Sequence, residues 1–164
     1  MSIDNNLFKD LMGSFPSGVT VVTAAHDGQR EGITASAFSS VSMEPKLILV
    51  CLDKMKKSCQ LIRQSGGFAV NILATDQKFW GERFAGFHKD VTDRFEGREV
   101  QTLESGAPVF VDARAWMDCR LWQAYDGGDH EIFVGEVLAG GTNAEKPPIL
   151  YFDRAWRGVG DPVG

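Results

Sequence analysis

Three short stretches carry residue types that could bind or act on a ligand. The first is Gly127-Gly128-Asp129-His130, which stands directly before an apolar run. A histidine where a turn enters a strand can reach a ligand in a cleft while the sheet behind it stays rigid. Its ring can contact a nicotinamide amide or a phosphate. Histidines also occur in turns without any ligand, and the sequence alone leaves both interpretations open.

The second stretch runs from Thr34 to Ser40 and joins small residues to hydroxyl groups; its members include Ala35, Ser36, Ala37 and Ser39. Small side chains allow a flat ligand to approach the backbone closely. Hydroxyl and N–H groups can then hydrogen-bond the polar edge of that ligand. A flavin-like ring needs such a wall. An edge strand with solvated hydroxyls is the alternative.

The third stretch, Asp53 to Cys59, lies between the end of an expected strand and the start of an expected helix. Ser58 is placed near the helix N-terminus, where free N–H groups attract anions. Lys54, Lys56 or Lys57 could add positive charge for a phosphate. A solvated lysine cluster on a surface turn explains the same residues.

Strands are the elements expected to position these stretches. Residues rich in β-branched side chains or in alternating apolar positions predict strands, and Asp27-Gly28 is typical of a hairpin turn. Asp126 to Asp129 is expected to join the last two long strands. The predicted strands cover residues 18–25, 32–38, 46–52, 68–73, 108–111, 113–125, 130–139 and 150–152.

Helices are expected at three places. Apolar residues recur every fourth position from Ile3 to Phe15, which predicts an amphipathic helix that ends near residues 13–16. A second helix is predicted over residues 57–64, and a third carries Phe79, Trp80 and Phe84 with Thr75 or Asp76 as its cap. Residues 86–105 are expected to form a long surface loop.

Many strands with short connections and few helices favour a mainly β fold, an antiparallel barrel with peripheral helices, over a parallel doubly wound sheet. The length of 164 residues predicts a single domain over 1–164. The net charge of −5 argues against a nucleic-acid-binding surface. No apolar run approaches the roughly 20 residues of a membrane span. Residues 1–6 lack the basic and apolar regions of a signal peptide, so neither a signal peptide nor a membrane association is expected.

Several kinds of chemistry lack their sequence signals. Cys51, Cys59 and Cys119 are odd in number and have no metal-binding spacing, so free thiols in the cytoplasm are expected. The chain has no Gly-x-Ser-x-Gly motif and no paired histidines at metal-ligand spacing, so hydrolase and metal sites are not predicted. It also lacks Gly-x-Gly-x-x-Gly, so a nicotinamide nucleotide would not bind in the Rossmann manner.

Taken together, the chain resembles the flavin reductase-like split-barrel family, the small NAD(P)H:flavin oxidoreductases of two-component monooxygenases. The resemblance runs in order from about residue 7 to 157. Two positions depart from the family pattern: Lys46 replaces a second proline after Pro45, and Cys59 follows Ser58. The matching segments are 15–23, 32–45, 47–52, 68–73, 93–95, 128–137 and 150–152.

The resemblance implies a homodimer of FMN-binding split barrels, antiparallel and Greek-key-like, with flavin near the dimer interface. By position, Thr34, Ala35, Ser36 and Ala37 would border the flavin ring, with Ser39, Ser40 and Cys51 close by. Lys57 and Ser58 would approach the flavin phosphate. Gly128, Asp129 and His130 would help to place the nicotinamide.

The expected activity is hydride transfer from NADH, or NADPH, to FMN or FAD, which would supply reduced flavin to a partner monooxygenase. Aligned rings need no strong acid or base, which agrees with the lack of a catalytic triad. Two other classes stay open: a non-catalytic flavin carrier on the same barrel, and an FMN oxidase similar to pyridoxamine-phosphate oxidase. A purely structural protein–protein interaction module is disfavoured, because the hydroxyl-rich and glycine-rich stretches would then have no role.

Overall fold

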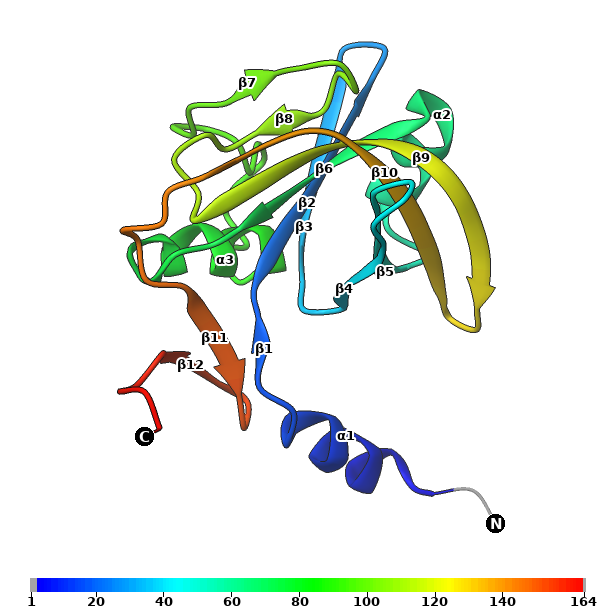
Figure 1. Ribbon diagram of the computed structural model, residues 1–164. Coiled ribbons are helices and arrows are strands. Elements are labelled where there is room, and N and C mark those ends of the chain that lie inside the picture. The colour runs from blue at the N-terminus through cyan, green and yellow to red at the C-terminus, as the bar shows by residue number, and fades with distance from the viewer. Residues whose placement is uncertain (1–2, 164) are drawn as a thin grey trace.

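The computed structural model describes residues 3–163, and antiparallel strands dominate it (Figure 1). Within that range, no helix is both long enough and apolar enough to cross a membrane. The strands are β1 Ser17–Gly18, β2 Thr20–His26, β3 Gln29–Ala35, β4 Phe38–Ser42, β5 Leu47–Asp53, β6 Gly67–Ile72, β7 Gln101–Thr102, β8 Pro108–Val109, β9 Ala115–Gly127, β10 His130–Thr142, β11 Ile149–Phe152 and β12 Ala155–Gly158.

The main sheet has seven strands in the order β3-β2-β6-β9-β10-β5-β4, and all of its pairs are antiparallel. This confirms the predicted mainly β, antiparallel architecture. The two edge strands, β3 and β4, are consecutive in the chain and are joined only by Ser36 and Ala37. The sheet therefore curls until its two edges meet, and Ser36-Ala37 crosses the seam between them.

The hairpin between β2 and β3 turns at Asp27-Gly28, as predicted. Both residues have positive φ, 47° and 75°. Such angles fit the tight turns that match the twist of paired strands, and glycine adopts them without strain. The hairpin sets the register in which Thr20 faces Ala35, so it fixes where β3 ends and the seam begins.

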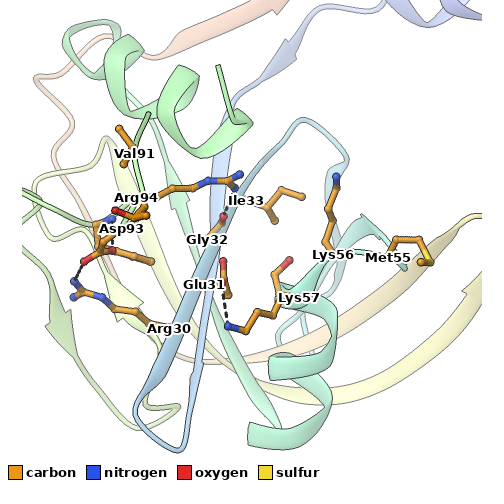
Figure 2. Close-up of a pocket in the computed structure, with 13 residues that line it drawn as sticks. Arg30, Glu31, Gly32, Ile33, Met55, Lys56, Lys57, Val91, Asp93 and Arg94 are labelled. Atoms are coloured by element: carbon orange, nitrogen blue, oxygen red, sulfur yellow. Dashed lines mark hydrogen bonds and ion pairs between the residues drawn. The ribbon is translucent and has the colours of Figure 1, made fainter. Parts of the chain in front are cut away.

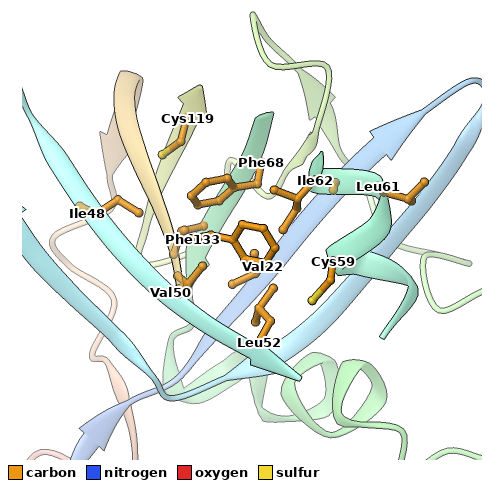
Figure 3. Close-up of a cluster of buried hydrophobic side chains, with 12 residues drawn as sticks. Val22, Ile48, Val50, Leu52, Cys59, Leu61, Ile62, Phe68, Cys119 and Phe133 are labelled. Atoms are coloured by element: carbon orange, nitrogen blue, oxygen red, sulfur yellow. The ribbon is translucent and has the colours of Figure 1, made fainter. Parts of the chain in front are cut away.

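The inside of the curled sheet is filled by buried apolar side chains (Figure 3). Phe68 and Phe133 are fully buried at its centre. Gly135 leaves the space for this packing, because a Cβ there would lie 2.5 Å from the Phe68 ring. Helix α2, Lys57–Ser65, adds Leu61 and Ile62 to the same cluster. Burial of this apolar surface is the main source of the barrel's stability.

A second apolar cluster lies on the other face of β2. Val19 and Val21 pack there with Phe84 of α3, Lys78–Ala85, and with Phe95 and Phe110. Both faces of β2 are thus buried, which explains its unbroken run of apolar and β-branched residues.

Three sequence predictions need correction. The expected strand 32–38 is broken at Ser36-Ala37, because the chain changes sheet edges there. Thr75 and Asp76 do not cap α3; they lie within a 3₁₀ turn, Thr75–Gln77, and the Gln77 side chain accepts a hydrogen bond from the N–H of Ala74. The expected loop over residues 86–105 contains a short strand, β7, at Gln101–Thr102, and β12 lies outside every predicted strand.

Helix α1, Asn5–Gly13, is present as predicted, with Asp4 as its N-cap. It does not pack as an amphipathic helix on its own chain, since none of its residues is buried. In Figure 1 it stands away from the barrel beside β1 and β11. The apolar side chains of this segment are at least 47% exposed: Leu7, Phe8, Leu11, Met12 and Phe15.

Candidate functional site

A pocket opens at the seam of the barrel, and we call it the seam pocket. Its walls come from the end of β3, the crossing loop, the end of β5 and the first residue of β10. The sequence separates these segments widely, and the curl of the sheet brings them together. The lining residues are Ile33, Thr34, Ala35, Ser36, Ala37, Cys51, Leu52, Asp53 and His130.

Backbone hydrogen bonds hold the crossing loop in place. The N–H of Cys51 donates to Ala37 O at 3.1 Å, and that of Phe38 donates to Ser36 O at 3.0 Å. The Thr34 hydroxyl donates to Gly81 O on α3 at 2.6 Å. That hydroxyl is therefore already engaged, whereas Ala35 and Ala37 offer only a small, flat wall. The loop is suited to a planar ligand.

His130, the first residue of β10, also lines the seam pocket, and β5 lies between β10 and β4 in the sheet. His130 pairs with Asp53 in the β5–β10 ladder, and its Nδ1 lies 2.7 Å from Asp129 Oδ1. The hydrogen bond from the imidazole holds the pKa of the Asp129 carboxyl below its usual range. A carboxylate on Nδ1 favours the tautomer with the proton on that nitrogen, which leaves Nε2 of the neutral ring as an acceptor.

Cys51 is the thiol of the seam pocket, and burial raises its pKa. Cys59 lies on α2, in the buried cluster inside the barrel, where burial and the charge of Glu131 raise its pKa to about 11. Its Sγ is 3.1 Å from Asp53 O. Both thiols are thus protonated at neutral pH, which argues against a thiolate nucleophile here.

A second pocket, which we call the basic pocket, shares Ile33 with the seam pocket. It lies between β3, the start of α2 and the loop after α3 (Figure 2). Its volume of about 360 Å³ is within the range of small-molecule sites. The lining residues are Arg30, Glu31, Gly32, Ile33, Met55, Lys56, Lys57, Ser58, Val91, Thr92, Asp93, Arg94 and Phe95.

The basic pocket carries four basic and two acidic side chains, a local excess of two positive charges in a chain of net charge −5. Only one cation is closely paired: Arg30 Nη2 lies 2.9 Å from Asp93 Oδ2. Lys57 Nζ is 3.4 Å from Glu31, and Lys56 Nζ is 3.8 Å from Asp53. Exposed pairs of this length are weak, so both lysines can turn to an anionic ligand.

Ser58 is the residue that indicates a ligand site most clearly. It is the second residue of α2, only 3% exposed, and its Oγ has no hydrogen-bond partner among the described residues. Buried hydroxyls are normally hydrogen-bonded. The first N–H groups of α2 also lack intrahelical partners, and the helix dipole favours negative charge at this end. The start of α2 therefore fits a phosphate group.

The outer wall of the basic pocket is the predicted loop after α3, which lacks regular structure over residues 87–100. Arginines attach it to the barrel: Arg83 donates to Asp93 O at 2.9 Å, and Arg94 lies 3.4 Å from Gly32 O. A hydrogen bond from the N–H of Phe95 lowers the pKa of Asp93. This segment was expected to be a surface loop, but Phe95 is buried beneath it.

The predicted site residues fall into four groups. Thr34, Ala35, Ser36, Ala37, Cys51 and His130 meet in the seam pocket, and Lys57 with Ser58 lies in the adjoining basic pocket. Gly128 and Asp129 form the exposed turn behind His130. Ser39 and Ser40 lie outside both pockets on exposed β4, where the Ser39 hydroxyl donates to Ser40 O.

Two site residues received no role from the sequence, Arg30 and Arg94. Their spacing of 64 positions (94 − 30) gives no motif, and only the folded loop places them in one pocket. In the sequence, only the two arginines close together at 94 and 98 could have indicated a basic site in this loop. Lys54, which was considered for phosphate, lies outside the basic pocket and binds the β9–β10 turn.

The chain matches the family model described as flavin reductase like domain over residues 12–160. It is 39% identical over 158 residues to a flavin reductase (NADH) from Kitasatospora aureofaciens, covering 94% of this chain and 81% of that protein. A reductase subunit of a flavin-dependent monooxygenase from Mycobacterium tuberculosis is 35% identical over 159 residues, covering 96% and 83%.

A solved structure extends this likeness to the fold. The NADH:FAD oxidoreductase of Streptomyces globisporus, in complex with NAD and FAD fragments, superposes with a TM-score of 0.86 at 33% identity. The match covers 96% of this chain and 95% of that one. With a family model that spans nearly all of the sequence, this chain belongs to the flavin reductase like domain family.

Proposed function

We propose that the protein is an NAD(P)H:flavin oxidoreductase that transfers hydride from NADH, or less favourably NADPH, to FMN or FAD. The reduced flavin would then serve a partner monooxygenase. Family membership and the NADH-dependent and monooxygenase-associated relatives support this reaction. The observation that carries it furthest is the unpartnered Ser58 hydroxyl, buried at the start of α2 next to the seam pocket.

In this proposal the flavin ring lies against Thr34, Ala35, Ser36 and Ala37, with Cys51 at its side, and its phosphate meets Lys57 and Ser58. Ile33, shared by both pockets, makes the two contacts compatible with one ligand. That Ser39 and Ser40 contact the flavin beyond its ring remains a prediction. When bound, the flavin supplies the hydride acceptor.

The residues of this chain contribute position rather than proton transfer. The small loop residues allow close approach of two stacked rings. His130 lines the seam pocket, and Asp129 occupies its Nδ1, so Nε2 is the ring nitrogen left for a ligand. That nitrogen can accept a hydrogen bond from the carboxamide of a nicotinamide, with Gly128 leaving room at the turn. The protonated thiol of Cys51 contributes an uncharged surface to the seam pocket.

Anaerobic mixing of the protein with NADH and each of FMN, FAD and riboflavin tests the reaction. We expect stoichiometric bleaching of the flavin and, in air, multiple turnovers. A yellow protein whose flavin is not reduced by either nicotinamide nucleotide would instead be a flavin carrier. Oxidation of pyridoxamine phosphate would point to the oxidase class.

Replacing His130 with alanine should raise the KM for NADH about tenfold and leave flavin affinity unchanged, because one hydrogen bond of about 1.4 kcal/mol is lost. Steady-state kinetics with either substrate varied measure both values. His26→Ala is the matched control, since His26 lies at the distant β2–β3 turn. An unchanged KM for NADH in His130→Ala would remove His130 from the site.

We also propose that the protein is a homodimer in which α1 packs on a second copy. Exposed apolar side chains along α1 support this, as does a pocket that joins Phe8, Met12 and Phe15 to Ser36 of the crossing loop. Sedimentation analysis of the wild type and of a Phe8→Glu/Leu11→Glu variant tests it. A monomeric wild type would exclude the dimer.

Two further proposals concern the whole chain. A single domain over residues 1–164 agrees with the extent of the family match. A cytoplasmic location agrees with the three free thiols, Cys51, Cys59 and Cys119, which a reducing compartment preserves.

A further inference from the structure

We propose that Lys54 is a positioning residue, whose ammonium group holds the β9–β10 turn so that His130 faces the seam pocket. Lys54 directly follows β5, the strand that pairs with the start of β10. The proposal rests on the function proposed above, in which His130 receives the nicotinamide.

Lys54 makes three hydrogen bonds to the turn, two from its side chain and one from its backbone. Nζ donates to Asp126 Oδ1 at 2.8 Å and to Gly128 O at 2.6 Å. Its backbone N–H donates to Asp129 O at 3.1 Å. One residue thus binds three of the four positions that precede His130. Its side chain is 34% exposed, so the stem is largely covered.

The carboxylate that accepts from Lys54 also takes part in a hydrogen bond within the turn. Asp126 Oδ1 also accepts from the Gly128 N–H at 2.8 Å. Gly128 has a φ of +83°, an angle that suits glycine and that the turn must keep. Hydrogen bonding from Lys54 keeps the pKa of the Asp126 carboxyl low, so its charge persists at neutral pH. The ammonium group therefore ties the end of β9, at Asp126, to the first residue of the turn, Gly128.

The residue that follows His130 in the chain is also held by an ion pair. Glu131, which is buried, pairs with the guanidinium of Arg63 on α2 through two contacts of 2.6 and 2.9 Å. His130 itself is 46% exposed, and its ring contacts only Asp129 among the hydrogen bonds of the described residues. The orientation of the imidazole is therefore set by its neighbours. Arg63 fixes the strand after it, and Lys54 fixes the turn before it.

A turn that is mobile before binding must be ordered by the ligand, and this ordering weakens the affinity. Lys54→Met keeps the covered stem and removes the ammonium group. We expect the KM for NADH to rise about fivefold to tenfold, with kcat and flavin affinity near the wild-type values. Amide hydrogen exchange of residues 126–130 should accelerate in the ligand-free protein. Exchange in β5 should not change.

Lys146→Met is the matched control, because the Lys146 side chain is similarly covered, with 27% exposure and one ion pair to Asp76 at 3.2 Å, and it lines neither pocket. Lys54→Arg should restore most of the NADH affinity. Asp126→Asn should reproduce part of the Lys54→Met effect. The double variant should be no worse than Lys54→Met alone, since both remove one interaction.

The outcomes separate the two proposals. If amide hydrogen exchange at residues 126–130 is the same in Lys54→Met and the wild type, Lys54 does not hold the turn, whatever the protein's activity. Faster exchange with an unchanged KM for NADH, while His130→Ala still raises it, would overturn the positioning role. If the wild type oxidises no NADH with any flavin, the proposed function fails, and hydrogen exchange alone still decides whether Lys54 holds the turn.

Discussion

Replacing Ser58 with aspartate should weaken flavin binding on the order of a hundredfold. The new carboxylate would stand at the start of α2, within a few ångströms of the proposed phosphate position. Two like charges at such distances repel by about 1–4 kcal/mol, depending on the local dielectric, and 1.4 kcal/mol is a tenfold change in affinity. Fluorescence quenching of FMN or FAD on titration with the protein measures the loss.

Circular dichroism of Ser58→Asp checks that the fold is kept, because Ser58 is buried and a buried carboxylate costs free energy. The helix dipole offsets part of that cost, since it favours an acidic residue in the first turn. Gln64→Glu makes the same charge change at the opposite end of α2, on an exposed side chain, and should leave flavin affinity almost unchanged. Ser58→Ala should cause a several-fold loss only. Equal flavin affinity in Ser58→Asp and the wild type would contradict a phosphate site at this helix.

Replacing Phe133 with alanine should lower the free energy of unfolding by about 3–5 kcal/mol. The Phe133 ring is fully buried among the apolar side chains inside the barrel (Figure 3). Its removal leaves a cavity that neighbouring strands cannot close without breaking their ladders. Because whole domains are stable by only about 5–15 kcal/mol, chemical denaturation followed by circular dichroism should show a large shift in the midpoint.

Tyr125→Ala provides the comparison for this variant. Tyr125 lies on β9, the strand next to β10, but is 54% exposed. Its loss should change the free energy of unfolding by about 0.5 kcal/mol or less. Similar destabilisation by both substitutions would mean that the barrel interior does not determine stability as the burial pattern indicates.

Local sequence patterns predicted most of the elements correctly. Strands β2, β5 and β6 and helix α2 lie within one or two residues of their expected ranges. These segments have a strong periodicity or a dense run of β-branched residues, so local preference and burial act in the same direction. The turn at Asp27-Gly28 was predictable for the same reason, since few residue pairs adopt its dihedral angles.

The errors occur where tertiary contacts override local preference. Residues 32–38 read as one strand, yet the chain must leave one sheet edge at Ser36 to reach the other. Helix α1 has an apolar stripe typical of core packing, but its own chain offers no surface to cover it. Neither outcome is encoded within a few neighbouring residues.

Local composition and spacing were enough to predict the strand-rich class, the hydroxyl-rich loop, the start of α2 and the turn before His130. Which of these segments lie together depends on the folded barrel. Curling of the sheet brought His130 into one pocket with Ala35 and Ala37, and it left Ser39 and Ser40 outside. The fold also brings Lys54 into contact with the β9–β10 turn and places Arg30 and Arg94 in the basic pocket. Such pairings depend on strand order and register, which are set by the packing of the whole barrel rather than by any one segment.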